Sequence, residues 1–260
     1  WRAGWPSLEM AIAGHAAAAE DVERLIQFNT LMAENHIQSM ITGLSHEGSS
    51  GPVLAARSAL EAAGRACWLA EPDINDVERL RRALRSRHDG GTQTLRLLRS
   101  FDRADAGAPE EERRLTELVA GLERLAGRMG VARSKKGRLL LDEPTDAELI
   151  QHALKWLGQP ERGQITQTML SATVHSGADL IGRAMLEDVN GGSAGRVFAV
   201  KLKRQEQMNA ASSAGLGYIH LLKCVGPLFR MDTAKSDETV SRLGGGVLSA
   251  HSPENVDWSA

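Results

Sequence analysis

Apolar side chains recur along most of the chain every three or four residues, the spacing that places them on one face of an α-helix. Glycine- and proline-containing breaks interrupt this pattern, for example the Asp-Gly-Gly sequence at residues 89–91. The pattern predicts about nine helices, near residues 6–43, 54–70, 76–88, 92–103, 109–129, 144–158, 164–185, 204–228 and 236–243. Their short connections favour an all-α fold, a single helical bundle over residues 1–250, with residues 251–260 as a flexible tail.

Residues at two of the predicted helix starts support these boundaries. Thr145 and Glu148 have the spacing of a capping box, in which each side chain bonds the backbone of the other residue. Asp73 or Asn75 can cap the third predicted helix. The least regular part of the chain has room for a short strand at residues 139–141.

The charge balance argues against two classes of partner. The chain has 260 residues, with 31 basic and 33 acidic side chains, and its net charge is −2. Binding to nucleic acid or to an anionic membrane surface needs a basic excess, so the composition disfavours both. No apolar run is long enough to span a bilayer and no signal peptide is visible, so we expect a soluble, cytoplasmic protein. The sequence leaves open whether the protein forms homo-oligomers or hetero-oligomers.

The two cysteines, Cys67 and Cys224, both lie in apolar helical stretches. A disulfide between them is one alternative, but buried free thiols in a reducing compartment fit the sequence better. No group of Cys and His residues has the sequence spacing of zinc ligands. We therefore expect neither a metal site nor a cofactor.

One predicted helix carries charge where an apolar surface is expected. Residues 54–70 read LAARSALEAAGRACWLA, which is apolar on nearly all sides and typical of a buried central helix. Arg57, Glu61 and Arg65 nevertheless recur every four residues and form one stripe, with Trp68 on the same side. Two arginines against one glutamate leave a positive charge that a bound anion, or an acid from another helix, would neutralise.

Two interpretations of this first stripe remain open. A structural ion-pair ladder between helices is the more common arrangement, and core packing alone accounts for Trp68. In the alternative, Arg57 and Arg65 bind a small anionic substrate and Trp68 lines its pocket. Glu61 then orients the arginines and is a catalytic candidate.

A second polar stripe lies on the helix predicted over residues 164–185. Gln167, Ser171, His175 and Asp179 are spaced four apart and share one face. They do not form a catalytic triad, because they point the same way and do not converge on one atom. Ser171 is expected to bind substrate or to hydrogen-bond the first stripe. His175 and Asp179 are candidate proton-transfer groups, since an imidazole titrates near neutral pH.

Three segments resemble a known group of proteins: RSALEAAGRACWLAEPDINDVERLRRAL, PTDAELI and MLSATVHSG. They are similar to helical proteins, common in actinobacteria, of the family called domain of unknown function 5677. That family shows an Arg-x3-Glu-x3-Arg-x2-Trp helix and a later Ser-x3-His segment, and the resemblance covers about residues 50–185. Ser176 separates the histidine from Gly177, and the aromatic residue often found before the serine is absent. The resemblance implies a helical fold and singles out the two stripes, but it brings no established activity.

Arg82 and His88 have the spacing of the Arg and His in the HEPN class of helical nucleases. Arginines crowd residues 79–87, so composition alone produces this spacing. Ala83 also stands where those nucleases usually carry a polar residue. We interpret residues 82–88 as a solvated basic face without catalytic function.

We expect the two polar stripes to pack face to face. Unpaired polar groups in a core are costly, and each stripe has groups that the other can satisfy. The resulting pocket favours a helical enzyme that acts on a small anionic metabolite by elimination, cyclisation or group transfer, for example in specialised metabolism. The alternatives are a non-catalytic helical module of a defence or regulatory system and a HEPN-like ribonuclease.

Overall fold

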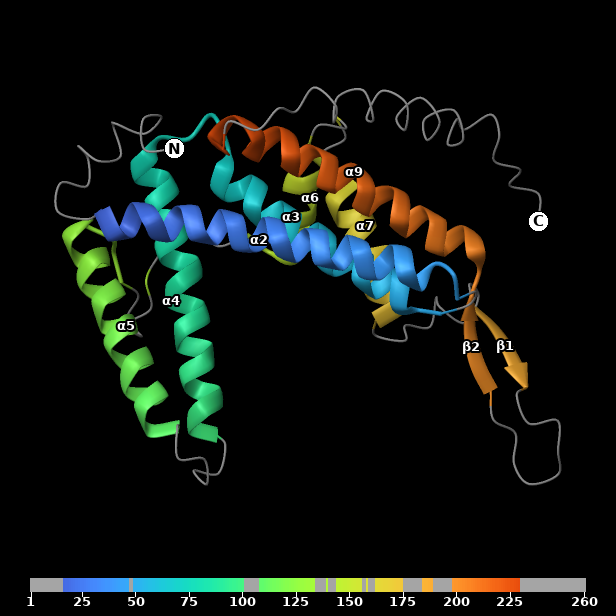
Figure 1. Cartoon of the computed structure of the whole chain (residues 1–260), viewed down its shortest axis with the longest axis horizontal. Helices are drawn as coiled ribbons and strands as arrows, with labels where there is room; N and C mark the ends of the chain where they lie inside the picture. Colours follow the sequence, from blue (N-terminus) through green and yellow to red (C-terminus); the bar gives the residue numbers. More distant parts are fainter. Residues whose placement is uncertain are drawn as a thin grey trace. The chain divides into compact units, whose positions relative to one another are not determined.

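The computed structural model describes residues 16–46, 49–100, 108–133, 139, 144–155, 158, 162–174, 184–188 and 198–229. Seven helices and one two-stranded antiparallel ribbon make up this part of the chain (Figure 1). The predominance of helices confirms the predicted all-α class. The last predicted helix, over residues 236–243, lies outside the described residues, so the total of about nine stays a prediction. None of the described helices combines the length and the apolarity that crossing a bilayer requires.

The chain divides into two compact units. Unit 1 consists of the described residues within Ile26–Pro72 and Thr145–Ala260. Unit 2 consists of the described residues within Arg2–Leu25 and Asp73–Pro144. Helix α2, Ala16–Gly43, contributes residues to both. The single domain predicted over residues 1–250 stays a prediction.

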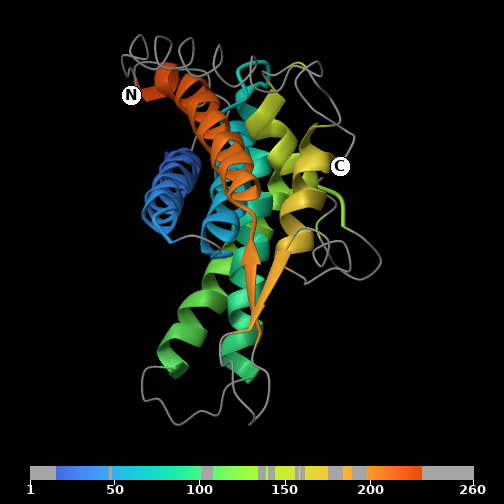
Figure 2. The same ribbon diagram turned by 90° about the vertical axis from the view of Figure 1, so that its right-hand side faces the viewer.

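Four helices form the body of unit 1. Helix α3 (Gly51–Ala70) packs along α9 (Arg204–Phe229) and against α6 (Asp146–Leu154), and α6 also packs on α7 (Arg162–Val174). Figure 2 shows α6 and α7 together on one flank of the α3–α9 pair. The fully buried side chains on these helices include Leu60, Leu69, Leu149, Ile150, Leu154, Leu221 and Val225. The helix predicted over residues 54–70 is therefore present as α3, and its Leu60 and Ala63 are 0% and 1% exposed.

Glycines allow the helices of unit 1 to approach closely. A Cβ on Gly64 of α3 would overlap the carbonyl oxygen of Leu149 in α6. A Cβ on Gly217 of α9 would lie 2.6 Å from Cδ2 of Leu60 in α3. The missing side chain at Gly64 lets the backbones of α3 and α6 approach closely, and the one at Gly217 leaves room on α9 for the Leu60 side chain of α3.

The helix predicted over residues 164–185 is present as α7 over Arg162–Val174, and residues 175–183 lie outside the described residues. Residues 184–188 form strand β1 (Ala184–Asp188), which pairs antiparallel with β2 (Phe198–Leu202). The register runs from Ala184 opposite Leu202 to Asp188 opposite Phe198. The helical prediction is wrong at residues 184–185, because a partner strand rich in β-formers supplies backbone hydrogen bonds that the local pattern cannot reveal.

Two helices pack side by side in unit 2: α4 (Asp76–Ser100) and α5 (Ala108–Arg128) (Figure 1). The core between them contains Leu84, Leu122, Leu125, Ala126 and Leu139. Leu139 also forms an isolated antiparallel bridge with Arg133, which places one bridged residue at the start of the predicted strand. Residues 140–141 of that strand lie outside the described residues.

Helix α4 continues through residues 89–91, where the sequence predicted a turn. Asp89 forms an ion pair with Arg85, one helical turn earlier, at 2.9 Å. A Cβ on Gly91 would lie only 3.1 Å from Cγ2 of Val119 in α5. The prediction of two helices was wrong here, because packing against α5 and local pairing outweigh the helix-breaking tendency of two glycines.

The predicted helix caps are confirmed. The amide nitrogen of Glu148 donates to the Thr145 hydroxyl at 3.3 Å, and the amide of Thr145 donates to the Glu148 carboxylate at 2.7 Å. Of the two candidates at the start of α4, Asn75 makes a capping bond, accepting from the amide nitrogen of Glu78 at 2.9 Å. These bonds satisfy backbone donors that have no partner inside their helices.

Candidate functional site

The first predicted stripe is partly neutralised within the protein. Arg57 pairs with Glu61 at 2.6 Å and with Asp146, at the start of α6, at 3.2 Å. The side chain of Arg57 is 16% exposed, and the hydrogen bond to Glu61 is the main reason why the pKa of Arg57 is raised. An acid from another helix thus balances Arg57, which supports a structural ladder at this residue.

The rest of the first stripe has a different environment. Trp68 is 7% exposed and belongs to the apolar interior, in keeping with a packing role. Arg65 is half-buried, and among the described residues it has no ion pair. If the stripe binds an anion, Arg65 is the arginine left to hold it.

The second predicted stripe is described only in part. Ser171 accepts a hydrogen bond from the side-chain amide of Gln167 at 2.9 Å, within α7. Helix α7 contacts α3. His175 and Asp179 lie outside the described residues, so the meeting of the two stripes stays a prediction.

The basic segment over residues 82–88 is paired and partly buried, so the prediction of a solvated face is wrong. His88 is only 8% exposed, and one ring nitrogen lies 3.6 Å from Oε1 of Glu123 on α5. The guanidinium of Arg85 donates to the carbonyl oxygen of Leu139 at 2.8 Å. The sequence pattern could not reveal these contacts because they come from α5 and from the segment that follows it.

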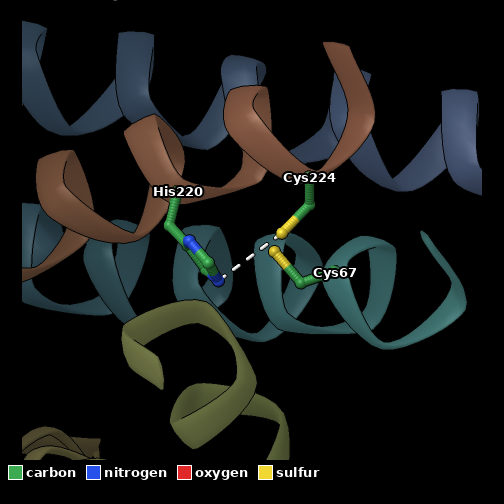
Figure 3. Close-up of side chains that lie close together, drawn as sticks. All are labelled: Cys67, His220 and Cys224. Carbon is green, nitrogen blue, oxygen red and sulfur yellow. Dashed lines mark hydrogen bonds between the residues drawn. The ribbon is translucent and has the colours of Figure 1, made fainter. Parts of the chain in front are cut away.

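The structure assembles a group of metal-ligating side chains that the sequence analysis missed. Cys67 of α3 meets His220 and Cys224 of α9, and Figure 3 shows the three side chains converging between the two helices. The two Sγ atoms and a ring nitrogen of His220 all lie within 4.8 Å of one another. The Nε2 atom of His220 is 3.5 Å from Sγ of Cys224. We call these three residues the Cys/His cluster.

The helices explain how the Cys/His cluster forms. His220 and Cys224 are four residues apart, so they stand on the same face of α9. Cys67 lies one turn after Gly64, where α3 makes its close contact with α6. Cys67 is 3% exposed, whereas His220 and Cys224 are only partly buried. Solvent therefore reaches the α9 side of the cluster.

The two thiols of the cluster have opposite acid–base properties. The pKa of Cys224 is lowered to about 5, chiefly because the Cys67 thiol donates a hydrogen bond to its thiolate, and also through His220 and the positive charge of Lys155. The pKa of Cys67 is raised well above its usual value by the same hydrogen bond and by burial. Cys224 thus carries the negative charge and Cys67 keeps its proton, and a thiolate is both the nucleophilic and the metal-binding form of cysteine.

Both cysteines are free thiols, as the sequence analysis expected. The expectation of no metal site rested on the absence of closely spaced Cys and His ligands. His220 and Cys224, one turn apart on a predicted helix, were the two members of the cluster that the sequence could reveal. Cys67 is far away in the sequence, and only the packing of α3 on α9 reveals it.

No protein-family model matches the chain, and it matches neither a curated protein nor a solved structure. The resemblance to the family called domain of unknown function 5677 therefore stays a prediction from the three quoted segments.

Proposed function

We propose that unit 1 binds one thiophilic metal ion, Zn²⁺, through Cys67, His220 and Cys224. The observation that carries this proposal is the convergence of two thiols and one imidazole from two packed helices. Sulfur and imidazole nitrogen are the ligands that zinc prefers in proteins.

The spacing of the three ligand atoms supports the proposal. Zinc bonds of about 2.3 Å to sulfur and 2.0–2.1 Å to nitrogen, at tetrahedral angles, separate a sulfur from a nitrogen ligand by about 3.6 Å and two sulfurs by about 3.8 Å. The His220 Nε2 to Cys224 Sγ distance is 3.5 Å, and no pair in the cluster is farther apart than 4.8 Å. Small side-chain movements are enough to reach zinc geometry.

The number and exposure of the ligands indicate what kind of zinc site this is. Three protein ligands leave the fourth tetrahedral position for water or a small molecule, as in catalytic and exchangeable zinc sites. His220 and Cys224 are partly exposed, so this position can face solvent. The site then resembles an open zinc centre more than a closed structural one.

Titration with Co²⁺ tests the proposal, because cobalt reports its ligands through absorption bands. We expect one Co²⁺ per chain, with sulfur-to-cobalt charge-transfer bands and the strong visible bands of tetrahedral coordination, and displacement by Zn²⁺. Cys67→Ser and Cys224→Ser should each abolish the spectrum. His220→Ala should weaken binding at least tenfold, while the exposed His46 provides a matched control in His46→Ala. A spectrum without charge transfer, or one that survives the cysteine substitutions, would refute the proposal.

The anionic-metabolite enzyme predicted from the polar stripes is a second candidate. It is supported by Arg65, a half-buried arginine without an ion pair among the described residues. An uncompensated guanidinium of this kind suits a carboxylate, sulfate or phosphate group.

A further inference from the structure

We infer that the Cys/His cluster is a redox switch, in which a hydroperoxide joins Cys67 and Cys224 in a disulfide and thereby releases the metal ion. The release step rests on the proposed zinc-binding function. The closure of the disulfide depends only on the two sulfur atoms.

The positions of the two sulfurs support disulfide closure. Their Sγ atoms lie within 4.8 Å of each other, between helices α3 and α9, where Gly217 of α9 leaves room for the Leu60 side chain of α3. A disulfide requires about 2.05 Å, which side-chain rotation and a small helix shift can provide. Cys67 and Cys224 are the two cysteines of the 260 residues, so within this sequence each is the possible disulfide partner of the other.

The difference in exposure sets the order of events. Cys224 is partly exposed and Cys67 is buried behind it, so a dissolved oxidant meets Cys224 first. The deeper Cys67 is then the resolving thiol. Sensor cysteines commonly have this arrangement, an accessible thiol beside a second one.

The chemistry balances in two steps. The sulfur of Cys224 attacks one oxygen of the hydroperoxide, an S–O bond forms as the O–O bond breaks, and the other oxygen leaves as water or alcohol after taking up a proton. The sulfur of Cys67 then attacks the Cys224 sulfur, an S–S bond forms, and the hydroxyl group leaves as water with the Cys67 proton. With hydrogen peroxide, two thiols and one peroxide give one disulfide and two molecules of water.

Oxidation removes two of the three zinc ligands at once. The affinity of such a site comes from thiolates, and a single imidazole that remains does not hold zinc. Reduction by a dithiol regenerates both thiols and restores the site. The metal content of the protein would therefore follow the peroxide level around it.

The test uses zinc-loaded protein treated with hydrogen peroxide. We expect one zinc released per chain, measured with a chromophoric zinc indicator, together with the loss of both free thiols and a mass decrease of two hydrogens. Dithiothreitol should reverse all three changes. Metal-free His220→Ala protein should still close the disulfide, whereas metal-free Cys67→Ser protein should stop at a sulfenic acid on Cys224 that dimedone traps.

The outcomes of this test distinguish the redox switch from the proposed zinc binding. Zinc-loaded protein that keeps its metal, or that loses it without forming a disulfide, overturns the switch but leaves zinc binding intact. Disulfide closure in a protein that never binds zinc or cobalt overturns the proposed function, and with it the release step.

Discussion

The imidazole Nε2 of His220 lies 3.5 Å from the Sγ of Cys224, which follows it by one turn of α9. Residues four apart on a helix face the same way, so α9 holds this pair together without help from loops. Helix α3 then adds Cys67, the buried member of the cluster. The acid–base chemistry of each sulfur therefore depends on the neighbouring groups of the cluster.

The reactivity of Cys224 toward iodoacetamide should depend little on pH between 6 and 8. Its pKa is lowered to about 5, so the thiolate already dominates in this range and the rate should fall only as the pH approaches 5. An ordinary thiol of pKa about 8.5 reacts about 75-fold faster at pH 8 than at pH 6. Peptide mass spectrometry of modified Cys224 measures the rate, with the urea-unfolded chain as control. A steep rise up to pH 8 in the folded protein would contradict the assignment.

Substitution of Cys67 by alanine should raise the pKa of Cys224 more than any other change at the site. The hydrogen bond from Cys67 is the largest cause of the lowered pKa, whereas the charge of Lys155 is a smaller one. The alkylation profile of Cys67→Ala should therefore shift toward that of an ordinary thiol. Lys155→Met is the matched comparison and should shift it less. The reverse order would show that Lys155 stabilises the thiolate more than Cys67 does.

The contribution of Cys224 to stability should increase with pH. A thiol whose pKa is lower in the folded than in the unfolded state stabilises the fold fully above the unfolded value, about 8.5, and this stabilisation is lost as the pH falls toward about 5. The difference in unfolding free energy between wild type and Cys224→Ser should thus grow from pH 5 to pH 8. Urea denaturation of the metal-free, reduced proteins at several pH values measures it. A difference that stays constant would argue against a thiolate at Cys224.

Replacement of Gly64 by alanine should destabilise unit 1, because the added methyl group meets the backbone of Leu149. Overpacking of this kind costs about 1–3 kcal/mol. Gly215→Ala is the matched control, since a Cβ there meets nothing within 4 Å and Gly215 also lies inside a helix. It should stabilise the protein by about 0.5–1 kcal/mol. Chemical denaturation measures both, and equal effects would mean that α3 and α6 are not closely packed at Gly64.

The two arginines of the first stripe should behave differently when replaced by methionine. Arg57→Met leaves Glu61 and Asp146 without their common partner, so we expect a loss of about 1 kcal/mol in unfolding free energy. Arg65→Met should cost less than about 0.5 kcal/mol, because no ion pair among the described residues is lost.

Anion binding at the stripe can be tested with the same two variants. Isothermal titration with inorganic phosphate should show binding to wild type that is abolished by Arg65→Met and retained by Arg57→Met. Phosphate binding that Arg65→Met leaves unchanged would exclude this stripe as the anion site.

The positions of most helices follow from local signals in the sequence. The helix predicted over residues 54–70 is observed as Gly51–Ala70, and the one predicted over 204–228 as Arg204–Phe229. The capping box at Thr145 and Glu148 forms as expected. These features depend on interactions between residues three or four apart, and such local interactions can be predicted from the spacing of residue types in the sequence.

The predictions that failed concern segments whose conformation depends on a distant partner. Helix α4 passes through residues 89–91 because Gly91 packs closely on Val119 of α5. Residues 184–185 belong to a strand because β2 pairs with them. Neither partner can be identified from the local pattern of hydrophobic and polar residues.

The sequence by itself determined the helical class and the common helix face of His220 and Cys224, two of the three residues of the Cys/His cluster. Only the tertiary structure placed Cys67 beside them and Asp146 beside Arg57. The physical reason is the same in both cases. A helix fixes the relation between its own side chains, but the contact between two helices depends on where their small residues and apolar faces allow them to approach, which here includes Gly64 and Gly217.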